Sequence, residues 1–399
     1  MNVTDVGHLT NDSDAGDDKL DIEAKKTGRD IWQLAEFYTE AFFDDINKLN
    51  ILKPDIICRA TQHIDAQLEL IGILLKGGYA YDTKEAIYFD TSKFPDYGKL
   101  AGLKTGKRIS RTKHHGGKKN KQDFALWFYT KGKHKNHIMR WNAPWGTGFP
   151  GWHIECSAMS MLYLGDHFDI HAGGVDHIPV HHTNEIAQSE AATGKKFVNY
   201  WLHGEFLVLD KAKMAKSSGN FITLNTLIEK GLDPIGYRYF CLQAHYRKQL
   251  SFSWQALENA NKAFDQLKER IIEIKKKKES KKSIISRYYK NEFLAAINDD
   301  LNMPIALAIL WEVVKDNGLN NKDKYKLILD FDRVLGLNLD KIREEKVELS
   351  KEIKDLIKHR EDARKKKDWK KADGIRDKLL KMDIVLEDTP GGVKWKRVR

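Results

Sequence analysis

Apolar residues recur at helical spacing over most of the chain, and the segments with strand-like spacing are short. The helices expected in the first half cover residues 31–49 and 63–76. Aromatic residues at helical spacing favour a core face for the first helix; they are Trp32, Phe37, Phe42 and Phe43. Short strands are expected at 2–4, 79–81, 86–89 and 168–170. The basic, glycine-bearing segment 102–122 is expected to be a loop.

The second half has helical spacing almost throughout and is rich in lysine. The expected helices cover 224–244, with an Asp233–Pro234 cap inside it, and then 254–278, 291–316 and a stretch from 353 to 380. Two strands, 384–386 and 393–398, are expected around a Thr-Pro-Gly-Gly turn at the end. The lysine run 275–278 is more typical of a solvated helix end than of a specific contact.

Charge adds a preference for a polyanionic partner. The 399 residues contain 68 Lys and Arg against 57 Asp and Glu, a formal net charge of +11. Such a balance favours nucleic acid, although a lysine-rich surface without a partner is the alternative.

Three scattered cysteines, Cys58, Cys156 and Cys241, cannot form a disulfide framework, which favours the reducing cytoplasm. We expect no membrane association, because no apolar run is long enough to span a bilayer and no signal peptide is evident.

One group of residues has the composition of a metal site. His181 and Glu185 are four residues apart, which places both side chains on one face of a helix, and Cys156 could add a thiolate. Three protein ligands leave an open position on zinc, and zinc favours a thiol substrate over a hydroxyl one. A structural His–Glu pair remains the alternative. The neighbouring candidates are His153, His167, His171, His177 and His182.

Two further segments could handle a nucleotide. The segment 213–220, KMAKSSGN, joins Lys213 and Lys216 to small residues, and a mobile loop of this kind can stabilise leaving pyrophosphate. The glycine-rich turn 171–176 would let a ribose or adenine approach the backbone, with Asp176 accepting from ribose hydroxyls. An ordinary surface turn and a plain strand-to-helix turn are the alternatives. Neither a Walker A motif nor a G-x-G-x-x-G fingerprint occurs.

Together these segments resemble the cysteinyl-tRNA synthetases, which are class I aminoacyl-tRNA synthetases. The matching segments are 151–160, 171–176, 181–190 and 213–217, in the family's order, with 4–9 and 386–392 near the ends. The resemblance implies ATP-dependent ligation of L-cysteine to tRNA(Cys) through a cysteinyl-adenylate, with Zn²⁺ selecting the thiol. The tail 353–399 argues against a cysteine ligase of the same fold that acts on an amino sugar.

The resemblance also implies roles for single residues. The implied metal ligands are Cys156, His181 and Glu185, and Trp152 resembles the tryptophan of the cysteine pocket. Lys213 and Lys216 are the expected catalytic residues, and Ala215 replaces the first serine of the KMSKS signature. The expected ATP-binding residues are Lys216, Gly174, Asp176 and His171.

The implied fold class is α/β: an incomplete class I synthetase Rossmann-like catalytic domain with a β-containing insertion, a helical anticodon-binding bundle and a small C-terminal α+β piece. The expected divisions are 1–225 for the catalytic domain (insertion about 77–135), 226–262 for a stem-contact linker, 263–348 for the bundle and 349–399 for the C-terminal anticodon-binding piece.

One departure from the family affects the expected activity. In the family, a leading segment with the first Rossmann strand, a zinc-ligating cysteine and the HIGH signature precedes the part that matches Thr4–Asp5, and no His-x-Gly-His occurs in these 399 residues. We therefore expect weak or no adenylation, an exposed sheet edge and poor solubility of this chain alone. A non-catalytic tRNA-binding paralogue, and one half of a split synthetase completed by a separate chain, remain alternatives.

Overall fold

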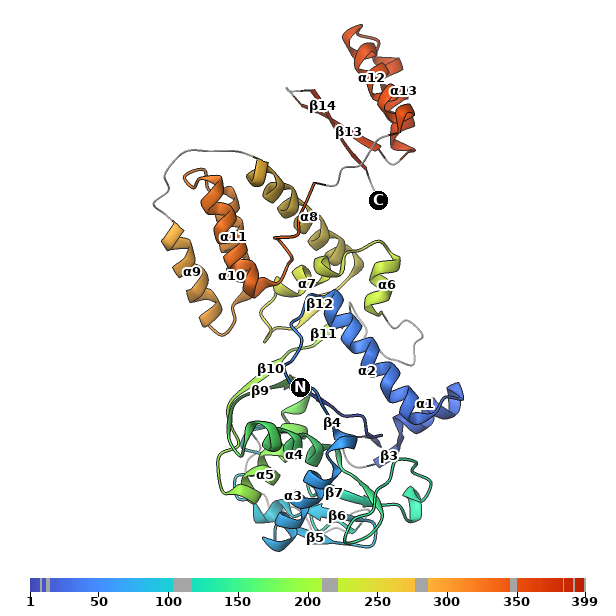
Figure 1. Cartoon of the computed structure of the whole chain (residues 1–399), viewed down its shortest axis with the longest axis vertical. Helices are drawn as coiled ribbons and strands as arrows, with labels where there is room; N and C mark the ends of the chain where they lie inside the picture. The colour runs from blue at the N-terminus through green and yellow to red at the C-terminus, as the bar shows by residue number, and fades with distance from the viewer. Residues whose placement is uncertain are drawn as a thin grey trace.

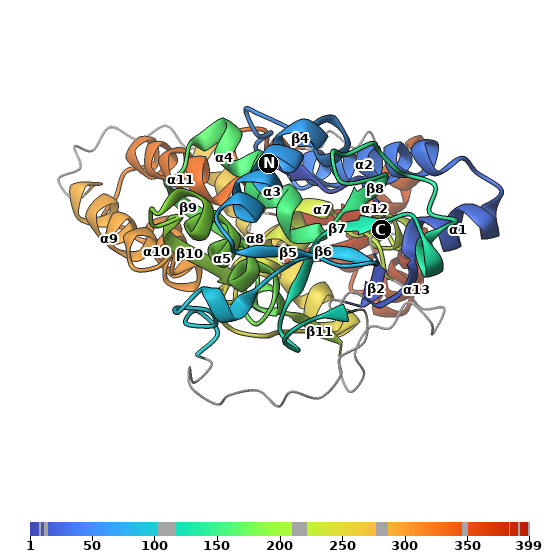
Figure 2. The ribbon, with the colours of Figure 1, turned by 90° about the horizontal axis from the view of Figure 1, so that it is seen from below.

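The molecule is elongated, with a small β-sheet at one end and a helical hairpin at the other (Figure 1). A computed structural model describes the chain except for residues 8, 12–14, 103–116, 210–221, 277–285, 345–349, 383, 390–391 and 398–399. Viewed along the long axis, α1 (Lys19–Thr27) and α2 (Ile31–Lys48) lie on the side opposite α9 (Ser286–Asn298) and α10 (Met303–Lys315) (Figure 2). Within the described residues, no helix is both long and apolar enough to cross a membrane.

Short parallel strand pairs with helices packed on them form the α/β part of the chain. The pairs are β1 (Asn2–Val3) with β4 (Cys58–Arg59), β9 (Phe168–Gly174) with β10 (Val198–Gly204), and β11 (Leu207–Leu209) with β12 (Leu250–Phe252). The helices that contact one another beside them are α3 (Ile64–Lys76), α4 (Trp152–Leu164) and α5 (His181–Thr193). A helix between parallel neighbours, as in β9–α5–β10, is the βαβ unit of Rossmann-like sheets.

An antiparallel sheet interrupts this α/β part. Its order is β5 (Ala80–Asp82), β6 (Ala86–Phe89), β7 (Phe124–Tyr129) and β8 (Gly148–Pro150), and β2 (Leu9–Asn11) forms a separate hairpin with β3 (Ala15–Asp18). Every residue of β6 and β7 is buried, because α3 and α4 cover one face of the sheet and loops cover the other. Its strands β5 and β6 correspond to the short strands expected at 79–81 and 86–89, and β7 and β8 were not expected.

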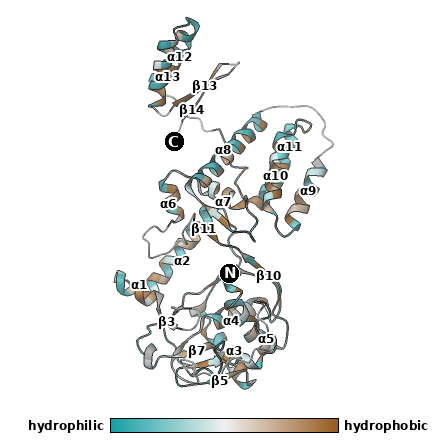
Figure 3. Ribbon diagram, turned by 180° about the vertical axis from the view of Figure 1, so that it is seen from behind, coloured by the Kyte–Doolittle hydropathy of each residue, from teal (hydrophilic) through white to brown (hydrophobic). Residues whose placement is uncertain are grey.

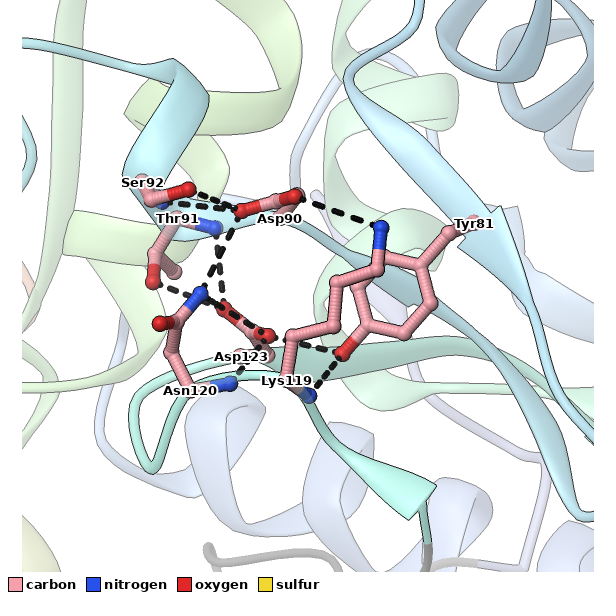
Figure 4. Close-up of polar contacts among 7 residues, drawn as sticks. All are labelled: Tyr81, Asp90, Thr91, Ser92, Lys119, Asn120 and Asp123. Atoms are coloured by element: carbon pink, nitrogen blue, oxygen red, sulfur yellow. Dashed lines mark hydrogen bonds and ion pairs between the residues drawn. The ribbon is translucent and has the colours of Figure 1, made fainter. Parts of the chain in front are cut away.

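A network of polar contacts closes one end of this sheet (Figure 4). The carboxylate of Asp123 is buried and accepts hydrogen bonds from the Thr91 amide (3.0 Å), the Asn120 amide (2.8 Å) and the Tyr81 hydroxyl (2.7 Å). Burial and the neighbouring carboxylates raise the pKa of Tyr81, so this hydroxyl remains a donor. Asp90, also buried, lies 3.7 Å from the ammonium of Lys119.

We expect Asp123→Asn to destabilise the chain by about 2–4 kcal/mol, because the new NH₂ group would face donors that need an acceptor. Urea unfolding, followed by fluorescence, measures the loss. Asp96→Asn is the matched control, since Asp96 is exposed and forms an ion pair with the exposed Lys99 at 3.8 Å. Equal stability of the two variants would contradict the assigned role of the network.

The aromatic residues of α2 do not form the expected core face. The side chains of Trp32, Phe37 and Phe42 are each 48% exposed, and the buried side of the helix consists of Ile31, Leu34, Ala35 and Thr39. The prediction from aromatic spacing was wrong for these residues. Ile31 and Leu34 are buried because they pack against Ala24 of α1 and against Met139.

Two of the expected long helices are each divided into two. The segment 291–316 breaks between α9 and α10, where Asp300 and Leu301 have positive φ and Pro304 opens the next helix. The segment 353–380 breaks at Lys367 (φ 60°), between α12 (Lys351–Lys365) and α13 (Trp369–Leu380). The helices expected at 31–49 and 63–76 are confirmed to within one residue.

The helical half has one continuous hydrophobic core. Its members come from α6 (Leu224–Glu229), α7 (Pro234–Leu242), α8 (Trp254–Lys276), α9, α10 and α11 (Asn321–Leu335). Hydrophobic residues concentrate along α10 in the middle of this bundle, whereas α12 and α13 carry mostly hydrophilic residues (Figure 3). A separate small core joins that last hairpin to β13 (Ile384–Thr389) and β14 (Gly392–Arg397), as the sequence predicts for a C-terminal α+β piece.

Arg238 of α7 ties the α/β part to the bundle. Its Nε donates to the carbonyl of Leu335 (2.7 Å), and its Nη1 donates to the carbonyls of Leu49 and Asn50 (2.9 Å each). Asn50 adds a hydrogen bond from its side chain to the carbonyl of Gly336 (2.9 Å). The turn after α2 and the end of α11 are therefore joined by the guanidinium group of Arg238 and by the side chain of Asn50.

Gly336→Ala should cost more stability than Gly194→Ala, although both glycines end helices in the left-handed conformation (φ 65° and 68°). Each alanine loses about 1 kcal/mol from backbone conformation. A Cβ at position 336 would in addition lie 2.5 Å from Nη2 of Arg238, whereas a Cβ at 194 meets nothing within 4 Å. Thermal unfolding of the two variants measures the difference, and equal losses would contradict a rigidly held guanidinium.

Candidate functional site

The candidate site is formed by the start of α4, the first turns of α5 and the carboxyl ends of β9 and β10. The strand expected at 168–170 continues to Gly174, so residues 171–174 belong to β9 and not to the expected turn. Close packing in this part of β9 requires glycine at 173, because a Cβ there would lie 2.7 Å from ring atoms of His177 and His182. The chain then makes a short 3₁₀ turn and enters α5 at His181. Ligands bind at this edge in open α/β sheets.

The structure brings the expected metal ligands together. One ligand atom each from Cys156, His181 and Glu185 lies within 4.8 Å of the others, and all three residues are buried. The helical spacing of four aligns His181 with Glu185 on α5, as expected. The packing of α4 against α5 then carries Cys156 to the same point.

Glu185 is the electrostatic centre of this group. Its side chain is fully buried, with Oε1 2.6 Å from Nε2 of His181 and Oε2 3.0 Å from Nε2 of His171. Both contacts lie outside hydrogen-bond geometry, and neither oxygen has another hydrogen-bond partner within the described residues. Burial raises the pKa of Glu185, but the two histidines outweigh that effect and leave the pKa below its ordinary value. The site therefore holds an ionised carboxylate.

The pKa of Cys156 is shifted in the opposite direction, upward. Burial first, and then the charges of Glu185 and Glu155, raise the pKa of this thiol well above its ordinary value. The Asn2 side chain opposes the shift by donating to Sγ (3.2 Å). Without a cation the group remains a thiol, and a bound divalent metal deprotonates it.

A second convergent group shares the same carboxylate. His171, His182 and Glu185 also present ligand atoms within 4.8 Å of one another. Burial lowers the pKa of His182 to about 3, so its ring is neutral near pH 7. His203 of β10 completes the cluster, with Nε2 2.9 Å from Nδ1 of His182. Sequence reasoning missed His203, because only the parallel register of β10 on β9, which sets it beside Gly173, brings it to the site.

These residues fit a zinc ion. The set offers sulfur, imidazole nitrogen and carboxylate oxygen, which are the donor types that zinc takes in proteins. The ionised, buried Glu185 without regular hydrogen bonds is the kind of group that a cation satisfies.

Of the other residues expected at the site, some lie beside the metal candidates and others do not. Trp152 packs its ring on His181, with 4.0 Å between ring centroids, beside the metal candidates. Nε2 of His171 lies 3.0 Å from Oε2 of Glu185. The carboxylate of Asp176 occupies the space that a Cβ at position 174 would need. His167 bonds to the carbonyl of Lys196 (2.7 Å) and belongs to neither convergent group. The expected loop residues Lys213 and Lys216 lie outside the described residues.

Comparison with known proteins gives consistent matches along the chain. Residues 2–262 match the family described as tRNA synthetases class I (C) catalytic domain, and residues 346–395 match the cysteinyl-tRNA ligase anticodon binding domain. A cysteine–tRNA ligase of Treponema denticola is 45% identical over 431 aligned residues, covering 100% of this chain and 87% of the relative. Cysteine–tRNA ligase 1 of Burkholderia lata is 47% identical and covers 98% of this chain and 82% of its own.

A solved structure supports the fold. Methionyl-tRNA synthetase of Mycobacterium tuberculosis, bound by methionyl-adenylate, superposes with a TM-score of 0.54 at 15% identity, covering 86% of this chain and 83% of that one. At this identity the likeness concerns the fold alone. With the match to the class I catalytic family, it confirms the α/β class I fold expected from the sequence, followed by a helical region.

Proposed function

The chain belongs to the cysteine–tRNA ligase family, and from this premise we propose that it joins L-cysteine to tRNA(Cys) through a cysteinyl-adenylate, with a zinc ion selecting the substrate thiol. The observation that carries the proposal is the buried convergence of Cys156, His181 and Glu185 within 4.8 Å. A zinc ion held there would take the substrate as a thiolate and so discriminate cysteine from serine.

The chain's own residues give the site its shape. The two oxygens of Glu185 lie close to Nε2 of His181 and of His171, and Nδ1 of His153 contacts the other ring nitrogen of His181 (2.9 Å). Trp152 packs over His181 and gives the pocket an apolar wall that excludes water. Substrate would reach the site at the carboxyl edge of β9 and β10.

For ATP, we propose the end of β9 and the 3₁₀ turn that follows it, with His171, Gly174 and Asp176, together with Lys213 and Lys216 acting on the leaving pyrophosphate. For tRNA, we propose the expected division of the chain: catalytic domain 1–225, stem contact 226–262, helical bundle 263–348 and anticodon-binding piece 349–399. The cytoplasm is the proposed location. The expectation of weak adenylation, and of a separate chain that completes the site, stays a prediction.

Calorimetric titration with L-cysteine tests the selection of the thiol. We expect the zinc-loaded chain to bind L-cysteine and to bind L-serine at least ~10³-fold more weakly. Cysteine binding that survives removal of zinc by a chelator would sink the proposal. Cysteine-dependent pyrophosphate exchange tests the adenylate separately. Near-normal exchange would contradict the expected weak adenylation and leave the role of zinc untouched.

A further inference from the structure

A cavity in the helical bundle lies outside the site described above. It has a volume of about 220 Å³ and lies among α8, α10 and α11, which pack against one another. Its lining consists of Arg270, Glu273, Ile274, Val314, Lys315, Asn317, Asn321 and Lys324. The cavity is larger than a single phosphate group, so a phosphate with part of a ribose could also enter it.

Positive charge dominates the lining. Arg270 of α8, Lys315 at the end of α10 and Lys324 of α11 face one acidic residue, Glu273, whose Oε2 lies 3.3 Å from Nη1 of Arg270. Arginine and lysine from separate helices converging on one hollow raise the local potential and attract anions.

Lys324 is fixed in the wall of the cavity. Its side chain is only 6% exposed, and its Nζ donates to the carbonyl of Val314 (3.1 Å) near the end of α10. The hydrogen bond fixes the ammonium group at one point of the lining, where it adds a positive charge. Because the Lys324 side chain is already held in place, ligand binding would cost it little conformational entropy.

Asn321 supplies an independent indication of a ligand. It is the first residue of α11 and is 8% exposed, and its Nδ2 has no hydrogen-bond partner among the described residues. A buried amide donor without an acceptor is unfavourable, so an acceptor from a ligand would stabilise it. The N-terminus of α11 adds its own positive potential at the same place.

We propose that this cavity binds a phosphate group. Cations, a buried amide donor and a helix N-terminus are the groups that bind phosphate oxygens, and Arg270 can turn from Glu273 to a stronger acceptor. A backbone phosphate of tRNA is the source if the proposed function holds, and a free phosphate compound is the other source.

The test compares two double variants of equal charge. Arg270→Gln with Lys315→Gln neutralises two cations of the lining. Lys262→Gln with Lys326→Gln neutralises two exposed lysines, one on α8 and one on α11, which do not line the cavity. Asn321→Asp is the third variant. It keeps the size of the side chain and suits a helix N-terminus, but it places a carboxylate where phosphate would bind.

Two measurements separate the sources. Thermal unfolding in potassium phosphate, against potassium chloride at equal ionic strength, should show stabilisation of the full chain that both lining variants lose and the control keeps. Binding of a tRNA(Cys) transcript should weaken roughly tenfold in the lining variants, and the slope of log K against log salt should fall by about 1 more than in the control.

A loss in the tRNA measurement alone identifies a backbone phosphate, and a loss in the phosphate measurement alone identifies a small phosphate ligand. Lining variants that match the control in both measurements overturn the proposal. If the unmodified chain binds no tRNA, the proposed function fails, while the phosphate measurement still decides whether the cavity binds phosphate.

Discussion

Replacing Cys156 with serine should reduce the zinc content of the purified chain from about one equivalent to almost none. Serine keeps the size of the side chain but removes the thiolate, so only two ligands of this group remain, His181 and Glu185. The second group around Glu185 contributes His171 and His182 but no sulfur ligand. The loss should come without unfolding, since serine is similar in size and its hydroxyl can accept the hydrogen bond that the Asn2 side chain donates to Sγ.

Metal analysis and the absorption of cobalt-substituted protein measure this effect. Cobalt bound to a thiolate gives a charge-transfer band in the near ultraviolet, and Cys156→Ser should lack it. Cys241→Ser is the matched control, because Cys241 is a free cysteine of α7 outside both convergent groups. Full zinc content in the Cys156 variant would contradict the metal assignment.

The same site predicts that zinc binding releases protons. Because burial and nearby carboxylates raise the pKa of Cys156, the thiol is protonated in the free chain at neutral pH. Metal binding must remove that proton, so the apparent zinc affinity should rise by about tenfold per pH unit below the pKa of the thiol. The Cys156 variant should lose this steep dependence.

Replacing Arg238 with methionine should destabilise the chain by about 2–4 kcal/mol, because three carbonyl groups lose a charged donor at once. Methionine keeps the length and the apolar contacts of the stem but cannot donate to Leu49, Asn50 or Leu335. Arg238→Lys should recover only part of the loss, since one ammonium cannot reproduce the planar fork of the guanidinium.

Urea unfolding, followed by fluorescence and by circular dichroism, measures this second effect. The two probes should separate in Arg238→Met, because the α/β part and the bundle would lose the three hydrogen bonds of this guanidinium and keep only that of the Asn50 side chain. Arg247→Met serves as the control, since Arg247 is exposed and pairs with Asp300 at the surface (2.6 Å). A loss no larger than that of the control would show that Arg238 does not carry the junction.

Several features of this protein were determined by local sequence. The spacing of apolar residues placed α2, α3 and α8 to within about two residues, because helical periodicity depends only on neighbours along the chain. The spacing of His181 and Glu185 placed both on one face of α5 for the same reason. The strands around the Thr-Pro-Gly-Gly turn followed from turn chemistry.

Other features depended on contacts between distant segments. The positive φ at Asp300, Leu301 and Lys367 divides helices that look continuous in sequence. The exposure of the aromatic residues on α2 depends on which stripe the rest of the protein covers. Which stripe of α2 is buried is set by what packs against it, whereas Pro304 was a local sign of the break before α10.

The candidate site also combines features set by local sequence with features set by tertiary contacts. Sequence by itself provided the residue types and the helical pair His181–Glu185. Only the tertiary structure carried Cys156 to them by packing α4 on α5, and set His203 beside His182 by pairing β10 with β9. The pairing register of parallel strands joins residues far apart in sequence, so the spacing along one strand cannot reveal its partner.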